Sequence, residues 1–548
     1  MVSMRKEINI KKINPFLSGI VVFISVFIFF VIFRAITGNI IIDDSFYHIK
    51  HAYLLRTQGL EQLESFPWMN FSIMNTGFSD YSFLYHVFLI PFTLGNLLLG
   101  IKISGAVMSA LLFCVLYLIL KKLNVKYPFI WSILALSSNA FLYRLLLARP
   151  FTLAIILSLL VFSFSFKKRY LSLLVTGLVN ALSYGVFIVA LVINGALFLM
   201  KFIKEKTLDF KLPLFLVFGL LLGYLIHPNF PNNFIINSLI NFYPFYSGHS
   251  PISELMPSDF KSLITQNILI WIIFCGLLSI LIYYRQELKK LKEKISVEGL
   301  TAFLLSIFFF ILTIRSQRFI EYWVPFTVLA GAIVARDFKV DVKLIEGFKK
   351  IWNTEHQPSN ITSSTFQSVK SVKGDTLDRR TNNMDHDQYI TRSRIFLAML
   401  AVLLSIIISL SFFKSFYNNY TSLKNADPYD RLKPASEWLI KNTPDKSIVY
   451  NVAWDEFPEL FFWNTHNYYI VGMDPTFLYE YDKSLYKKYQ DIYEGKDKNP
   501  SQTIKKYFNS KYIFSGKTNK DFIIVAEKDK NLEKAYEDQW SLIYKVAN

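Results

Sequence analysis

The sequence FLSGIVVFISVFIFFVIFRAI (residues 16–36) leads, after a short link, into DDSFYHIKH (residues 43–51). The first stretch is almost entirely apolar over about 20 residues, which is the length of a helix that crosses a membrane. The second places two carboxylates, a tyrosine, two histidines and a lysine where that helix leaves the membrane. Ionisable groups in such a place are costly unless they have a partner or a task. The two stretches therefore predict a membrane protein with reactive groups at the membrane surface.

The composition extends this prediction to the whole chain. Of its 548 residues, 53% are hydrophobic, and they gather in repeated long runs that indicate a polytopic membrane protein. The net charge of +18 lies in short loops between these runs, which is typical of cytoplasmic loops and not of nucleic-acid binding. Both cysteines, Cys114 and Cys275, fall in predicted spans, so we expect neither a disulfide framework nor a zinc motif.

The basic loops set the expected topology. If they and the N-terminus lie inside, the spans alternate without conflict and the C-terminus lies outside. The first apolar run is too long for a signal-peptide core, so we expect it to be retained. Residues 82–99 are also apolar and form either an interfacial segment or one of two weak spans. We expect about eleven helices, at 15–37, 103–120, 128–145, 151–166, 170–184, 187–201, 212–226, 265–284, 299–314, 320–335 and 394–413.

Four regions follow from this topology. Residues 1–335 form a transmembrane core whose first outer loop is 38–81, and 394–413 form the last span. Residues 336–393 form a polar inner insert, with 357–389 expected to be disordered by composition. Short apolar runs alternate with helical patterns in residues 425–548, which predicts a small soluble α/β domain. Within it we expect a strand at 522–525 and a helix at 531–538.

The first outer loop carries the candidate catalytic groups. If residues 43–53 are helical, Asp44, Tyr47, His48 and His51 share one helix face. A carboxylate there can act as a general base, and with His48 it can also bind a divalent cation. The alternative is ordinary helix capping by the aspartate.

Outer-side arginines form a second candidate group. Arg315 and Arg318 are three residues apart, which would place them on one helix face where both can contact phosphate oxygens. The alternative is snorkelling of arginine at a helix end. Arg149 lies in a turn between two spans, as either a further anion ligand or a satisfied turn residue. His227 ends a span and opens an aromatic loop that could close over a lipid or sugar.

Two further patterns narrow the function. Trp454-Asp455-Glu456 suits sugar binding, but a plain strand-to-helix turn is the favoured interpretation. The chain contains no glycine-rich phosphate loop, nucleophile elbow or HExxH motif. ATP-driven transport and serine or zinc hydrolysis therefore lack support.

Together these features resemble the GT-C superfamily of integral membrane glycosyltransferases, including the oligosaccharyltransferase, protein O-mannosyltransferase and aminoarabinose-transferase types. Asp43-Asp44-Ser45-Phe46-Tyr47-His48 is similar to their acidic motif after the first helix, and Arg315-Ser316-Gln317-Arg318-Phe319 is similar to their phosphate-contacting arginine region. The resemblance implies a mainly α, polytopic bundle of about 11–13 helices with a small extracytoplasmic α/β domain. The second acidic motif of oligosaccharyltransferases is absent at residues 147–151, which favours a monosaccharide lipid donor.

The resemblance implies a glycosyltransferase in the plasma membrane that moves a sugar from a polyprenyl-phosphate donor to a glycan, lipid or protein hydroxyl, with inversion. A metal-dependent oligosaccharyltransferase-like enzyme, using Mg²⁺ or Mn²⁺, is the first alternative. A lipid-linked sugar flippase and a non-catalytic envelope-assembly protein are the others. The expected catalytic residues are Asp43, Asp44 and His48, with Asp44 and His48 as ligands of any metal. The expected substrate-binding residues are Tyr47, His51, Arg149, His227, Arg315, Arg318 and Glu321.

Overall fold

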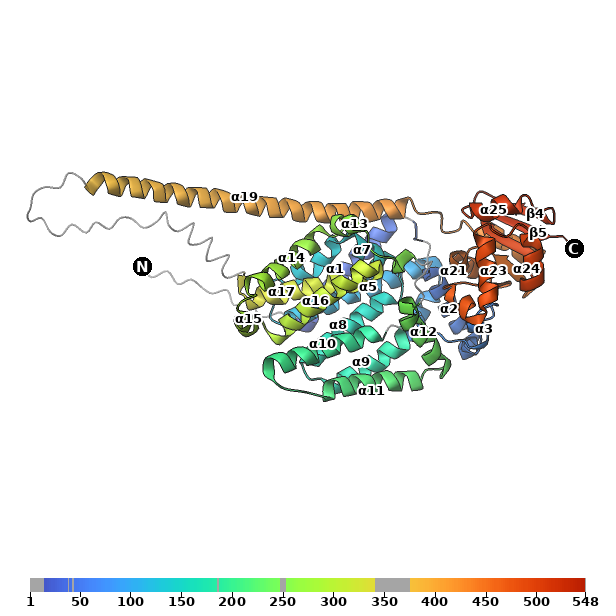
Figure 1. The fold of residues 1–548 in the computed structure, drawn as a ribbon, viewed down its shortest axis with the longest axis horizontal. Coiled ribbons are helices and arrows are strands. Elements are labelled where there is room, and N and C mark those ends of the chain that lie inside the picture. Colours follow the sequence, from blue (N-terminus) through green and yellow to red (C-terminus); the bar gives the residue numbers. More distant parts are fainter. Residues whose placement is uncertain are drawn as a thin grey trace, which may run out of the picture.

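A helical bundle fills the centre of the molecule, and a small sheet with its own helices lies at one end (Figure 1). The computed structural model describes residues 14–37, 39–41, 44–184, 187–246, 253–340 and 375–547. Asp43, one of the two predicted acidic residues, lies outside this part of the chain. The predicted fold class, a mainly helical membrane bundle with a C-terminal α/β unit, is confirmed.

The bundle helices have the following bounds. They are α1 (Pro15–Thr37), α2 (Ser45–Gln58), α3 (Ile73–Thr76), α4 (Phe83–Leu89), α5 (Leu97–Lys122), α6 (Pro128–Ile133), α7 (Asn139–Leu146), α8 (Phe151–Phe166), α9 (Tyr170–Ser183), α10 (Ile188–Glu205), α11 (Lys211–Leu225), α12 (Asn232–Tyr246), α13 (Phe260–Thr265), α14 (Ile268–Tyr283), α15 (Leu288–Lys294), α16 (Val297–Arg315), α17 (Ile320–Asp337) and α19 (Asp375–Lys424). Short 3₁₀ turns η1 (Gly59–Leu63), η2 (Ile90–Thr93), η3 (Leu134–Ser137), η4 (Ser253–Leu255) and η5 (Gln317–Phe319) join them.

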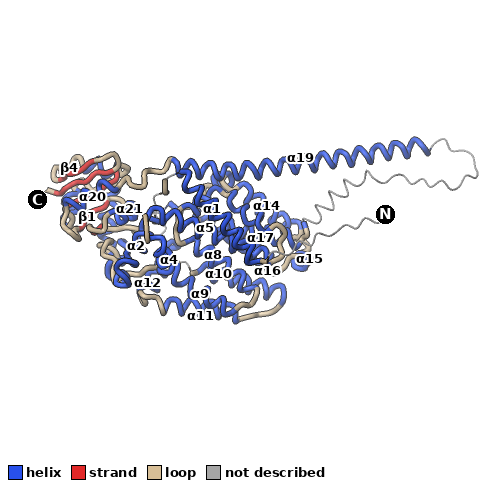
Figure 2. The backbone as a smooth tube through the Cα atoms, turned by 180° about the vertical axis from the view of Figure 1, so that it is seen from behind, coloured by secondary structure: helices blue, strands red, loops and turns tan. Residues whose placement is uncertain are grey.

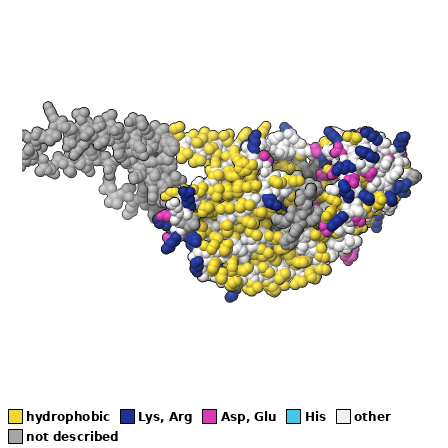
Figure 3. Space-filling model, viewed as in Figure 1, with side chains coloured by type: hydrophobic (Ala, Val, Ile, Leu, Met, Phe, Trp, Pro, Cys, Tyr) yellow, Lys and Arg dark blue, Asp and Glu magenta, His cyan; other side chains and the backbone are white. Residues whose placement is uncertain are grey.

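Every predicted span is helical, but fewer of them than expected are long enough to cross a membrane. Among the described residues, five helices meet the length and hydropathy of a span, and a bent pair makes a sixth. Several others have 10–17 residues, which at about 1.5 Å per residue is shorter than a hydrocarbon core of about 30 Å. Residues 82–99 contribute the short helix Phe83–Thr93 and the start of α5. Figure 3 shows a broad hydrophobic zone between the α15 end and the C-terminal sheet.

The span expected at 128–145 is not one continuous helix but a bent pair of helical segments. The chain bends by 87° between Pro128–Ser137 and Asn139–Leu146. At the break, the Ser138 hydroxyl accepts a hydrogen bond from the N–H of Phe141 at 3.0 Å and caps α7. An N-terminal serine cap favours a new helix start over continuation of the old helix. The bend turns α7 away from the direction of the preceding helical segment.

Glycines allow α9 and α11 to lie side by side. A Cβ atom at Gly219 would overlap the carbonyl oxygen of Leu174, and Cβ atoms at Gly177 and Gly223 would approach backbone atoms of the facing helix. Small residues let two helix backbones come close, which is a common basis of helix association in membranes.

Helix α19 is much longer than the predicted last span. It begins at Asp375 and therefore includes part of the segment expected to be disordered; the rest of that segment lies outside the described residues. No glycine or proline occurs between Asp375 and Lys424, so nothing in the sequence interrupts the helix. Its C-terminal part contacts α1, α7 and α14, and its N-terminal part extends past the bundle (Figure 1).

The C-terminal unit contains a five-stranded sheet in the order β2-β1-β3-β5-β4. The pairs β1–β2 and β1–β3 are parallel, while β3–β5 and β4–β5 are antiparallel. Figure 2 shows the sheet at the opposite end of the molecule from the start of α19. Its elements are α20 (Lys433–Asn442), β1 (Ile448–Asn451), η6 (Trp454–Glu456), α21 (Phe457–Trp463), β2 (Tyr468–Tyr469), α22 (Thr476–Tyr481), α23 (Lys483–Tyr493), α24 (Pro500–Phe508), β3 (Tyr512–Gly516), α25 (Lys520–Ala526), β4 (Leu532–Glu537) and β5 (Ser541–Val546).

Two assignments within this unit are wrong. The expected strand at 522–525 lies in α25, whose buried Phe522, Val525 and Ala526 follow helical spacing. The expected helix at 531–538 is the edge strand β4, because the Asp538 carboxylate accepts from the N–H groups of Trp540 and Ser541 and forms a hairpin turn into β5. Trp454–Glu456 forms a turn between β1 and α21, as favoured.

The first loop of the bundle joins the edge of this sheet. The Tyr469 N–H donates to the Trp68 carbonyl at 3.1 Å, and the Asn70 N–H donates to the Tyr469 carbonyl at 2.8 Å. Met69 thus forms a parallel bridge with Tyr469 of β2. The loop and the C-terminal unit therefore lie on the same side of the membrane bundle.

Candidate functional site

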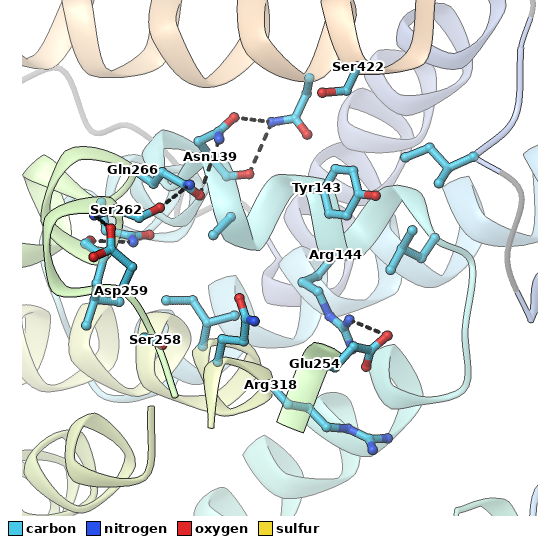
Figure 4. A pocket seen from close by; sticks show the side chains of 18 of the residues that line it. Asn139, Tyr143, Arg144, Glu254, Ser258, Asp259, Ser262, Gln266, Arg318 and Ser422 are labelled. Atoms are coloured by element: carbon cyan, nitrogen blue, oxygen red, sulfur yellow. Dashed lines mark hydrogen bonds and ion pairs between the residues drawn. The ribbon is translucent and has the colours of Figure 1, made fainter. Parts of the chain in front are cut away.

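A cavity of about 630 Å³ opens between α7, α13, the η4 segment, η5 and the end of α19. One end is charged and is lined by Arg144, Arg149, Glu254 and Arg318. Figure 4 shows Arg144 and Glu254 joined by an ion pair, with Arg318 beside them, while Asp259, Ser262 and Gln266 lie at some distance. The cavity therefore has one part with several charged side chains and a second part that is mostly neutral and polar.

The bend before α7 and the turn after it position two of the arginines. Arg144 lies in the last turn of α7, and Arg149 follows in the turn to α8. In this turn Ala148 has a φ of 54°, in the left-handed region, and its carbonyl accepts from the Tyr85 hydroxyl at 2.6 Å. The hydrogen bond holds a backbone conformation that few non-glycine residues adopt, and it thereby fixes the direction of Arg149.

Glu254 connects these arginines. One of its carboxylate oxygens lies 3.0 Å from Arg144 Nη1 and also contacts Arg149 Nη1. Burial acts to raise the pKa of Glu254, but the attraction of Arg149, Arg144 and Arg318 outweighs burial and holds that pKa well below its usual range. The carboxylate is therefore ionised at neutral pH.

Asp44 reaches the same cluster from the start of α2. Its carboxylate makes no capping hydrogen bond to the helix, which contradicts the capping alternative. Oδ2 instead lies 3.5 Å from Arg149 Nη1, and 31% of the side chain is exposed. An aspartate with an accessible carboxylate beside a cation is well placed to accept a proton from a bound hydroxyl.

Arg318 lies at the charged end, but Arg315 does not. Helix α16 ends at Arg315, and Ser316 adopts an extended conformation before η5. The expectation that the two arginines share a helix face is therefore wrong, because the helix does not continue between them. Arg315 is exposed and does not line the cavity, whereas Arg318 lines it and hydrogen bonds to the Tyr184 hydroxyl.

Glu321 is a buried carboxylate that pairs with Arg144 at the charged end of the cavity. It is 1% exposed and accepts from Arg144 Nε at 2.7 Å. Arg144, Arg149 and Arg318 thus face Asp44, Glu254 and Glu321, so the charges of these six residues balance. This pairing lowers the cost of burying them next to the membrane.

The second part of the cavity is rich in amides and hydroxyls and contains one carboxylate, that of Asp259. The Asn419 amide donates to Asn139 Oδ1 at 2.8 Å, and the Gln266 amide donates to the Ser262 hydroxyl at 2.6 Å. Ser422 lines the same wall. Neutral groups that both donate and accept hydrogen bonds suit the hydroxyls of a sugar.

The remaining predicted residues lie in a buried cluster next to the cavity. His48 Nδ1 lies 2.7 Å from His86 Nε2, and His86 Nδ1 lies 2.7 Å from Asp80 Oδ2. His51 lies 3.4 Å from Asp80, and His227 hydrogen bonds to the Asp80 carbonyl at 3.0 Å. Burial lowers the pKa of His48 and of His86. His48, His51 and His227 do not line the cavity.

Tyr47 belongs to this buried layer as well. Its ring packs on those of His51 and Phe66 and on Phe461 of the C-terminal unit. It is 2% exposed, so direct substrate contact is not supported for it.

The expected metal ligands Asp44 and His48 do not form a ligand group in the described residues. The carboxylates of Asp44 and Glu254 lie closest to the arginine end of the cavity, but both contact Arg149. A divalent cation between them would meet the guanidinium charge, so these residues do not fit Mg²⁺ or Mn²⁺ in this arrangement.

Four residues that contribute to this region had no assigned role in the sequence analysis. Asp80 lies in a predicted outer loop and Arg144 at the end of a predicted span, and a charged side chain in these places was the available signal. Glu254 lies in a long loop without a recognisable motif, and His86 lies in the ambiguous apolar segment. Their grouping depends on contacts between distant parts of the chain.

Solved structures with the same fold were found, although no protein-family model and no curated protein sequence matches the chain. The oligosaccharyltransferase AglB from Archaeoglobus fulgidus, in complex with an inhibitory peptide and a dolichol-phosphate, matches with a TM-score of 0.59 and 12% identity over 96% of this chain and 74% of that chain. ArnT from Cupriavidus metallidurans, bound to undecaprenyl phosphate, matches with a TM-score of 0.52 and 10% identity over 96% of this chain and 98% of that chain. The chain therefore shares its fold with these two proteins, as the resemblance to the GT-C superfamily implied.

Proposed function

We propose that this chain is a membrane glycosyltransferase that moves a sugar from a polyprenyl-phosphate donor to an acceptor hydroxyl. The observation that supports it most is the two-part cavity, with three arginines at one end and mostly neutral amides and hydroxyls at the other. Asp44 lies next to the arginine end, 3.5 Å from Arg149. A lipid-linked sugar has the same two parts, a phosphate and a set of hydroxyls. The structures of the same fold that hold dolichol-phosphate or undecaprenyl phosphate support a lipid-phosphate donor.

In the proposed reaction Asp44 accepts the proton of the acceptor hydroxyl. The acceptor oxygen forms a bond to the anomeric carbon from the side opposite the phosphate, and the bond from that carbon to the phosphate oxygen breaks. The lipid phosphate leaves with the electron pair, and the anomeric configuration inverts. Arg149 and Arg318 stabilise the developing charge on the phosphate, because prepositioned cations favour the transition state. We place the reaction on the outer face, where we also place the C-terminal unit.

A transfer assay in membranes tests the proposal. Radiolabelled polyprenyl-phosphate sugars are supplied to wild type, Asp43→Asn, Asp44→Asn and the control Asp209→Asn, whose carboxylate hydrogen bonds to Tyr170 away from the cavity. We expect Asp44→Asn to lose at least about 100-fold in release of label, within the usual range for general-base catalysis, while Asp209→Asn retains it.

Two results would contradict parts of the proposal. Full activity in both Asp43→Asn and Asp44→Asn would refute the assignment of the base. If wild type releases no sugar from any donor but moves lipid-linked sugar across vesicles, the protein is a flippase, and the cavity is a recognition site.

A further inference from the structure

Beside the cavity, three buried side chains bring metal-ligand atoms together. His51, Asp80 and His86 each offer one ligand atom, and these atoms lie within 4.8 Å of one another. It is the one such group of three in the part of the chain that the structure describes. Each of the three residues is at most 1% exposed.

His51 has no explanation as a hydrogen-bonded core residue. Neither of its ring nitrogens has a hydrogen-bond partner among the described residues. Its Nε2 lies 3.4 Å from Asp80 Oδ2, at the long limit of a hydrogen bond. Leaving a buried polar group unpaired costs about 1–3 kcal/mol, and a native structure that does so usually has an ion or water at the group.

The surroundings are those of a supported ligand set. His86 Nδ1 faces Asp80, while His86 Nε2 is paired with His48. A metal-bound histidine almost always uses its second nitrogen in such a pair. Both polar groups of the Asp80 backbone have partners. The Asp80 N–H donates to Asn229 Oδ1, and the Asp80 carbonyl accepts from His227 Nε2. These contacts fix the carboxylate before any ligand binds.

We propose that His51, Asp80 and His86 supply three of the four ligands of one zinc ion in a buried site. Two imidazoles and one carboxylate suit zinc, whereas Mg²⁺ and Ca²⁺ prefer oxygen ligands. Ligand atoms around tetrahedral zinc lie about 3.3 Å apart, close to the 3.4 Å between His51 and Asp80. The His86–Asp80 pair would open slightly as zinc replaces the shared proton.

The position of the site gives it a purpose. His51 lies two turns along α2 from Asp44, Asp80 lies in the segment that leads into α4, and His86 lies within α4. Zinc would fasten α2 to this segment and so fix the helix that carries Asp44. This inference does not depend on the proposed reaction, because the ion contacts no cavity residue.

Metal analysis of the purified full-length protein tests the inference. The protein carries a streptavidin-binding tag, since a polyhistidine tag would bind metal, and is purified without chelator. We expect about one zinc per chain in wild type, and less than about 0.1 in His51→Gln and Asp80→Asn. The matched control His466→Gln, in the C-terminal unit, should keep the wild-type content. His48→Gln should lower zinc affinity about 10- to 100-fold, as the loss of a supporting hydrogen bond does elsewhere.

A second measurement covers the case in which the ligand variants do not fold. Wild type is stripped with a chelator and titrated with Co²⁺, which should give visible absorption bands that one equivalent of Zn²⁺ removes. Wild type with less than about 0.1 metal per chain, both as purified and after equilibration with Zn²⁺ and Co²⁺, would overturn the inference. Folded His51→Gln and Asp80→Asn proteins that keep full zinc would also overturn it, by showing adventitious binding.

Discussion

Replacement of Arg149 by glutamine removes the cation that Asp44 and Glu254 share. Arg149 Nη1 lies 3.5 Å from Asp44, and 17% of the arginine side chain is exposed. At that distance two unit charges attract by about 5 kcal/mol at an effective dielectric constant of about 20. A phosphate that leaves at a similar distance from Arg149 would be stabilised by less than this, because Arg149 is partly exposed and other arginines lie nearby. We therefore expect Arg149→Gln to remove about 3–4 kcal/mol of transition-state stabilisation.

This loss corresponds to a decrease in kcat of about 100- to 1000-fold. Because the charge on the phosphate grows in the transition state, the KM for the lipid donor should change by much less than kcat. The assay is single-donor kinetics in detergent with a labelled lipid-linked sugar. Lys261→Gln, which removes an exposed cation on α13, is the control and should keep the wild-type kcat. If Arg149→Gln keeps kcat within about threefold, Arg149 does not stabilise the leaving group.

Three further changes test other parts of the structure. Glu321→Gln leaves Arg144 buried without its main carboxylate and should cost about 3–5 kcal/mol, seen as a lower thermal midpoint in detergent; an unchanged midpoint contradicts the buried pair. Gly219→Ala should also lower this midpoint, whereas Gly195→Ala, with open space around it, should not; equal midpoints would contradict the close packing of α9 on α11. Burial raises the pKa of Glu456 to about 8, so unfolding releases its proton above pH 4.5 and stability falls as pH rises to about 8. Glu456→Gln should remove up to about 5 kcal/mol of this pH dependence in urea-dependent proteolysis, and an unchanged slope would refute it.

The helices could be predicted from the sequence because apolar runs reflect local burial. The 87° bend before Asn139 could not, because the sequence around Ser138 has no proline or glycine to mark it. The hairpin at β4 was missed for a related reason. Residues with high helix propensity there pair with β5, and pairing between strands overrides local preference.

The candidate site shows the same division between local and distant information. Asp44 was predicted because two acidic residues adjoin a membrane helix. Arg149 was predicted because it lies in an outer turn, whereas basic residues usually gather in the inner loops. Arg315 and Arg318 were wrongly placed on one helix face, because spacing alone does not reveal where a helix ends. Glu254 had no local signal at all, since its role comes from contacts with residues more than 100 positions away.

The bridge between Met69 and Tyr469 also determines when the protein becomes competent during its synthesis. A ribosome makes the loop that follows α1 early, but the β2 edge that receives it emerges some 400 residues later. A chain released before residue 469 would carry Asp44 and every cavity arginine, yet its first loop would have no strand to pair with. Synthesis of β2 is thus needed before the first loop can pair with the sheet, and a chain that ends before it lacks this support.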